Sequence, residues 1–225
     1  MKYVILPILS CKKNFIIKIH YLNKKSLHLQ RSKIRNSRTA NLPIYMNDYK
    51  YNRYMKTLKP QDILILLKLI TYKDATFVIK NISSALKISQ SEISESLERC
   101  KNSGLIDSTK KKVMRLALEE LLVHGIKYVF PVTPGERVRG VPTAHSVSPM
   151  KELIVYNNDD IFVWPHPKGT VRGSAITPLY RTVPEVVQSD EELHQLLAIV
   201  DCIRLGKRRE VELATEELKK RLAYE

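Results

Sequence analysis

The side chains best suited to chemistry gather between residues 139 and 172 of this 225-residue chain. They are Arg139, His145, Ser146, Trp164, His166, Lys168 and Arg172. His145 and Ser146 could form a hydrolase triad with Asp159, in which the histidine accepts the proton of the attacking serine hydroxyl. However, Ser146 lacks the glycine pattern of a nucleophile elbow, and residues 165–169 lack the glycine spacing of a phosphate-binding loop. We therefore expect no catalytic residue and no enzymatic activity.

Binding is the alternative use of this region. The candidates for contacting a ligand or a partner protein are Arg139, His145, Trp164 and Arg172. Trp164 is the only tryptophan, and it could instead fill a core. The three cysteines lie far apart, with no Cys-x-x-Cys spacing and no nearby pair of histidines. Zinc sites and disulfide frameworks need such spacing, so we expect no metal and no cofactor.

Short strands should carry these candidates. Residues 126–130 are strand-like, and the proline- and glycine-containing stretch that follows, up to residue 150, predicts an ordered but irregular loop. Residues 152–156 and 161–164 then predict two strands joined as a hairpin. After a short helix near residue 184, two amphipathic helices separated by Gly206 end the chain. This helical pair could close a core or form a dimer interface.

Two helices with a short turn stand out earlier, within residues 74–106. Apolar residues at helical spacing predict one helix ending at Leu86 and a second that begins after Ser89 and stops at Gly104. Ser89 can cap the second helix, and Glu92, three residues on, can complete a capping box. A buried helix over residues 61–70 precedes the pair, and a fourth helix follows from about residue 114 to Gly125.

The second helix of the pair opens with small polar side chains and ends in Lys101-Asn102-Ser103-Gly104-Leu105-Ile106. With these features, residues 58–125 resemble the DNA-binding domain of MarR-like winged helix-turn-helix regulators. The resemblance implies a recognition helix, a wing at residues 107–113, and a homodimer on double-stranded DNA. The alternative is an ordinary helical hairpin of an all-α protein.

The predicted contacts fall into two groups. The candidates for contacting base edges are Gln90, Ser91, Ser94 and Glu95. The candidates for contacting phosphates are Ser89, Lys101, Lys110, Lys111, Lys112 and Arg115. Residues 89–103 carry three acids and two basic residues, so their net charge is −1. The helical spacing predicts that Arg99 lies on the solvent side of this helix, and affinity would depend on the lysine loop and on dimerisation.

Positive charge is distributed unevenly along the chain. The formal charge is +15, but residues 1–54 alone carry twelve Lys and Arg and one acid. We interpret residues 1–54 as a basic extension that is disordered or not native, with Met46 and Met55 as alternative starts. No secretory signal and no stretch of about eighteen apolar residues is evident, so we expect a soluble cytoplasmic protein without membrane contact.

The sequence thus predicts an α+β protein. Residues 55–125 would form a winged helix-turn-helix domain, and residues 126–225 a mixed domain with a small sheet and a helical hairpin, for ligand or partner binding or for dimerisation. The leading function is a sequence-specific transcriptional regulator, a repressor that acts as a dimer. The alternative is an antitoxin-like or other protein-interaction module whose C-terminal domain binds a partner protein.

Overall fold

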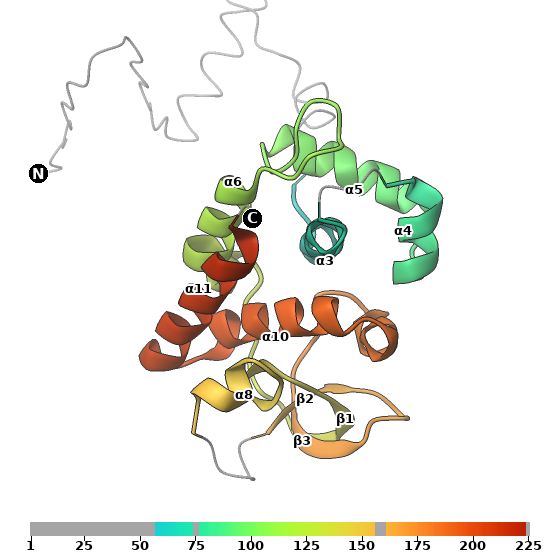
Figure 1. The fold of residues 1–225 in the computed structure, drawn as a ribbon. Helices are drawn as coiled ribbons and strands as arrows, with labels where there is room; N and C mark the ends of the chain where they lie inside the picture. The colour runs from blue at the N-terminus through green and yellow to red at the C-terminus, as the bar shows by residue number, and fades with distance from the viewer. Residues whose placement is uncertain (1–56, 74–76, 156–160, 224–225) are drawn as a thin grey trace, which may run out of the picture. The chain divides into compact units, whose positions relative to one another are not determined.

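The computed structural model describes residues 57–73, 77–155 and 161–223, and these residues form a mixed α+β fold, as predicted (Figure 1). The predicted basic extension lies outside the described residues. The described part begins with three helices, α3 (Pro60–Thr71), α4 (Ile79–Leu86) and α5 (Gln90–Asn102). α3 is buried on almost every side, as its continuous apolar sequence predicts. Pro60 occupies its first turn, and the Asp62 carboxylate accepts a hydrogen bond from the Lys59 amide at 2.8 Å.

The predicted fourth helix does not end at Gly125. It runs from α6 (Arg115–Glu120) through a π-helical turn, η1 (Leu121–Gly125), into α7 (Ile126–Val129). The strand predicted for residues 126–130 was therefore wrong. Leu122 and Ile126 are fully buried, so continuing the helix places both side chains in the core. The helix widens into the π turn over Leu121–Gly125 and continues beyond Gly125. The predicted domain boundary, between residues 125 and 126, lies inside this helical segment.

Three strands form a small closed barrel: β1 (Arg137–Thr143), β2 (Phe162–Pro165) and β3 (Val171–Ala175). β1 pairs antiparallel with both other strands, and β2 pairs parallel with β3. Two predictions fail here. β1 occupies the stretch predicted as an irregular loop, and residues 150–153 form the short helix α8 (Met150–Leu153) instead of one strand of a hairpin.

Closure of so small a barrel depends on glycines. A Cβ atom at Gly140 would overlap the carbonyl group of Trp164, and one at Gly173 would overlap the carbonyl group of Ile161. The strands can approach this closely only because these residues lack side chains. Gly140, which lies in the stretch predicted as a loop, is thus a requirement of the sheet.

The remaining elements are α9 (Val183–Val186), a 3₁₀ turn η3 (Val187–Ser189), α10 (Glu191–Leu205) and α11 (Arg208–Leu222). The 3₁₀ turn η2 (Ala144–Ser146) follows β1. The short helix and the final helical pair agree with the prediction, and the Asp190 side chain caps α10 by accepting from the Leu193 amide at 3.2 Å. α10 crosses the middle of the molecule between α3 and the barrel (Figure 1). One hydrophobic core includes residues from α3 to α11.

A buried polar network fastens the barrel to α10. The Asp201 carboxylate accepts from Thr143 Oγ1 at 2.9 Å, from Trp164 Nε1 at 2.8 Å and from Arg204 Nη1 at 2.7 Å. Burial raises the pKa of Asp201, and the neighbouring Arg204 opposes that rise. All four groups have partners, as a buried network requires. Among the described residues, no helix is long and apolar enough to span a bilayer.

Candidate nucleic-acid interface

The start of α5 presents an exposed polar surface. Gln90, Ser91, Ser94 and Glu95 are all exposed, and so is Lys101 near the other end of the helix. The opposite side carries Ile93, Leu97 and Cys100, which are buried. The structure therefore brings the four predicted base-edge residues together on one accessible face.

The turn before α5 has three residues, Lys87, Ile88 and Ser89. Lys87 ends α4 in the left-handed conformation, with φ of 55°, and Ser83 Oγ donates to the Ile88 carbonyl at 2.6 Å. Ser89 Oγ accepts from the Glu92 amide at 3.3 Å and so caps α5 as predicted.

The return bond of the predicted capping box is not formed. The Glu92 carboxylate instead accepts from Gln61 Nε2 at 3.4 Å and from the Tyr180 hydroxyl at 3.3 Å. Gln61 of α3 and Tyr180, which precedes α9, thus donate to Glu92 in place of the Ser89 amide. Glu92 ties the start of α5 to two distant parts of the chain.

A buried ion pair sets the position of α5 against α3. Arg99 donates from Nε to Asp62 Oδ2 at 2.8 Å and from Nη2 to Asp62 Oδ1 at 2.6 Å, and the two side chains are 2% and 0% exposed. The Asp62 carboxylate raises the pKa of Arg99, which keeps the guanidinium charged. The prediction that Arg99 lies on the solvent side of α5 was wrong, because α3 supplies this buried carboxylate.

The loop after α5 is held by one carboxylate. Asp107 Oδ1 accepts from the amides of Lys111 at 2.7 Å and Lys112 at 2.9 Å, while Oδ2 accepts from the amide and hydroxyl of Thr109. These hydrogen bonds hold the pKa of Asp107 far below its usual range, and the bond from the Lys112 amide has the largest effect. A single antiparallel bridge joins Ile106 to Val113. The loop is therefore a short ordered excursion and not a full hairpin.

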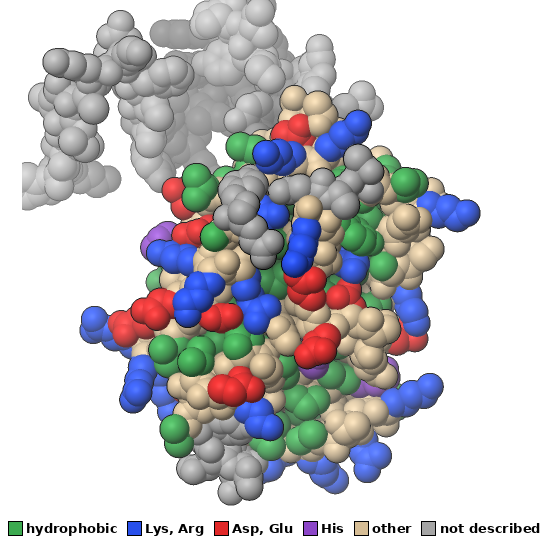
Figure 2. Space-filling view, in the orientation of Figure 1, with side chains coloured by type: hydrophobic (Ala, Val, Ile, Leu, Met, Phe, Trp, Pro, Cys, Tyr) green, Lys and Arg blue, Asp and Glu red, His purple; other side chains and the backbone are tan. Residues whose placement is uncertain are grey.

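The three lysines of this loop differ in environment. Lys110 forms an ion pair with Glu98 of α5, which reduces the positive charge that it presents. Lys111 and Lys112 are exposed. Figure 2 shows basic and acidic side chains interspersed over this face of the molecule. With Arg99 buried, Glu95 and Glu98 outnumber Lys101 on the accessible part of α5, which is therefore acidic.

Arg115, predicted to contact phosphates, is buried. Its side chain reaches the end of α11, where Nη1 donates to the Leu222 carbonyl at 3.4 Å. A basic side chain that stabilises the last carbonyls of a helix has a structural role. The packing of α11 against α6, which no local pattern reports, accounts for this difference.

A segment far along the chain packs against the turn before α5, and no sequence pattern indicated it. Thr182 Oγ1 donates to the Leu86 carbonyl at 2.8 Å, and Glu185 of α9 forms an ion pair with Lys87. The Lys87 side chain holds the pKa of Glu185 low, and the charges of His166 and Lys168 add to this effect. The start of α9 therefore lies against the turn, although about a hundred residues separate them in the sequence.

The predicted ligand residues divide into two pairs. Arg139 and Arg172 are exposed, and they face each other across β1 and β3. Trp164 and His145 are 1% and 5% exposed, so neither offers a surface to a ligand. Trp164 donates to Asp201, and His145 packs edge-on against Phe162 at a ring distance of 5.1 Å.

The structure adds no support for the hydrolase triad of Ser146, His145 and Asp159. Asp159 lies outside the described residues, and the buried Ser146 hydroxyl has no hydrogen-bond partner within the described part of the chain. Burial also raises the pKa of the Cys100 thiol to about 12, so it stays protonated at neutral pH. No group of three or more potential metal ligands occurs among the described residues.

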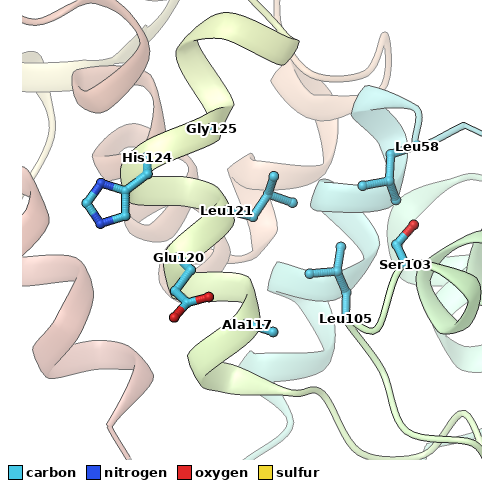
Figure 3. A pocket seen from close by; sticks show the side chains of 8 residues that line it. All are labelled: Leu58, Ser103, Leu105, Ala117, Glu120, Leu121, His124 and Gly125. Atoms are coloured by element: carbon cyan, nitrogen blue, oxygen red, sulfur yellow. The ribbon is translucent and has the colours of Figure 1, made fainter. Parts of the chain in front are cut away.

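A shallow pocket of about 480 Å³ lies between the start of α3, the end of α5 and the π turn (Figure 3). Leu58, Leu105 and Leu121 point toward one another across it. Ser103, Glu120 and His124 lie at its edge. Its wall is mainly apolar, and it contains no arrangement of groups that could do chemistry.

No family model, no curated protein and no solved structure matches this chain.

Proposed function

We propose that the protein is a transcriptional regulator that binds double-stranded DNA through α4, the three-residue turn and α5, and that it acts as a homodimer without catalysis. The observation that carries this proposal is the exposed start of α5, with its small polar side chains, beside the loop whose backbone amides bind the Asp107 carboxylate. Short polar side chains allow the backbone of a recognition helix to approach base edges closely. The MarR-like resemblance supports the same use of these elements.

In this proposal the start of α5 enters the major groove. Gln90 can contact adenine through both ends of its amide, and Ser91 and Ser94 can contact any base edge. Glu95 can accept a hydrogen bond from the amino group of cytosine. The capped first turn of α5, with Ser89, and the side chain of Lys101 face phosphates.

The lysine loop supplies the main phosphate contacts on this side. Lys111 and Lys112 are its exposed cations, whereas the Glu98 carboxylate partly neutralises the charge of Lys110. Arg115 is left out because its guanidinium is buried. The order that Asp107 imposes matters because a preorganised loop loses less conformational entropy when it binds.

The experiment is a salt titration of duplex binding by the full chain, using native upstream DNA and a scrambled duplex of the same length. Binding that survives at physiological salt only on the native sequence supports a specific regulator. Changing Lys110, Lys111 and Lys112 together to Gln should weaken binding to every sequence. The salt slope should fall by about 0.9 for each phosphate that the loop no longer neutralises. An unchanged slope would remove the loop from the interface, and no binding to either duplex would end the proposal.

A protein-interaction module is the second candidate, because the accessible part of α5 is acidic. Such a face would suit a basic partner better than a phosphate backbone. Glu95→Gln separates the two functions. If α5 contacts DNA, removing the negative charge of Glu95 should strengthen binding to scrambled duplex, whereas an interaction face for a basic protein would leave duplex binding unchanged.

A further inference from the structure

Two arginines on the barrel stand directly opposite each other. Arg139 of β1 and Arg172 of β3 are partners in the antiparallel ladder, so their Cβ atoms leave the same face of the sheet. Both are exposed. Within the part of the chain that the structure describes, neither guanidinium forms an ion pair or a hydrogen bond. Like charges at such positions repel, so this pair lowers the stability of the fold.

The arginines stand on a rigid frame. Each is followed by a glycine, Gly140 or Gly173, whose missing side chain allows the strands to close. Because the barrel is closed, it offers no free strand edge to an incoming peptide. A partner would therefore contact the guanidinium groups of this surface and not its backbone.

Positive charge continues from the arginines onto the loop between β2 and β3. The His166 amide donates to the Arg139 carbonyl at 3.2 Å, and Gly169 packs closely on Gly140. The exposed side chain of Lys168 lies in the loop between these two contacts.

We propose that Arg139, Lys168 and Arg172 form a second phosphate-binding track on the barrel, which holds the DNA backbone outside the segment read by α5. This inference rests on the proposed DNA-binding function and deepens it. Three exposed cations on β1, on β3 and on the loop between β2 and β3 fit the phosphates of a DNA backbone better than a single small anion, which would need an enclosed site. The guanidinium fork also matches the oxygens of a phosphate group.

The test uses the full chain and a scrambled duplex, which isolates contacts to the backbone from base readout. The variant Arg139→Gln/Arg172→Gln should flatten the plot of log affinity against log salt by about 1.8, which is about 0.9 for each arginine. The control is Lys127→Gln/Arg209→Gln, which removes the same charge from exposed positions on α7 and α11. The control should leave the slope unchanged. Thermal unfolding of both variants establishes that they fold.

The outcomes separate this inference from the proposed function. The inference fails if the arginine variant keeps the wild-type slope or changes no more than the control. In that case a loss of affinity in the Lys110, Lys111 and Lys112 triple variant would leave the DNA-binding proposal intact. If the wild type binds no duplex, both proposals fail. Binding to polyglutamate that depends on the two arginines, without their effect on duplex binding, would overturn the track in favour of an acidic protein partner.

Discussion

Removing Arg99 should destabilise the protein more than any change on the exposed face of α5. Arg99→Ala leaves the Asp62 carboxylate, which is 0% exposed, without the two hydrogen bonds of 2.8 and 2.6 Å that it accepts from the guanidinium. Breaking one partner of a buried ion pair costs about 3–5 kcal/mol, because the remaining charge stays buried. Glu95 provides the control, since its carboxylate lies 3.8 Å from Arg99 but is 59% exposed. Glu95→Gln should cost no more than about 1 kcal/mol.

Urea unfolding of the full chain, followed by far-UV circular dichroism, measures these differences. The double variant Asp62→Ala/Arg99→Ala removes both charges, so its loss of stability should be smaller than the sum of the two single losses by about 1–3 kcal/mol. If Arg99→Ala does not fold, Arg99→Lys keeps the charge but loses the fork and should give an intermediate loss. Strict additivity, or a loss below about 1 kcal/mol for Arg99→Ala, would refute the reasoning from burial.

Three further perturbations test the barrel and the loop. Gly140→Ala should destabilise the protein severely in thermal unfolding because its Cβ would overlap the neighbouring strand, whereas Gly135→Ala, whose Cβ would lie 3.6 Å from the nearest atom, should be nearly neutral. Arg172→Glu should stabilise the barrel by about 0.2–1 kcal/mol in urea, since it gives Arg139 an opposite charge; a drop in stability would contradict the repulsion. The folded pKa of Asp107 lies below its unfolded value, so its contribution is present above about pH 4 and is lost as the pH falls further; the protection of the loop amides, measured relative to the intrinsic exchange rate at each pH, should fall there, and Asp107→Asn should abolish that pH dependence.

Several elements could be predicted from the sequence because their signals are local. α3, α5, α10 and α11 follow from the helical spacing of apolar residues, and the caps at Ser89 and Asp190 need only a short polar side chain beside free amides. The accessible start of α5 follows from the same pattern. The winged helix-turn-helix interpretation and its DNA contacts stay predictions until binding is measured.

Other elements could not be predicted, for identifiable reasons. Residues 126–130 combine β-branched and aromatic side chains, which favour a strand locally, but the core position of Ile126 is reached only by continuing the helix. β1 contains Gly140 and Pro142, which are typical of a loop. Only the approach of β2 and β3, about twenty to forty residues away in the sequence, turns this stretch into a strand.

Local sequence is sufficient to specify α3, α5, α10 and α11, the caps at Ser89 and Asp190 and the polar start of α5, because such features depend on residues three or four positions apart. Which charges are accessible, in contrast, is settled by tertiary packing. The fold buries Arg99 against Asp62 and Arg115 beneath the end of α11, while it leaves Arg139 exposed opposite Arg172. The physical reason is that burial and pairing depend on residues far apart in the chain, whose approach no local pattern encodes.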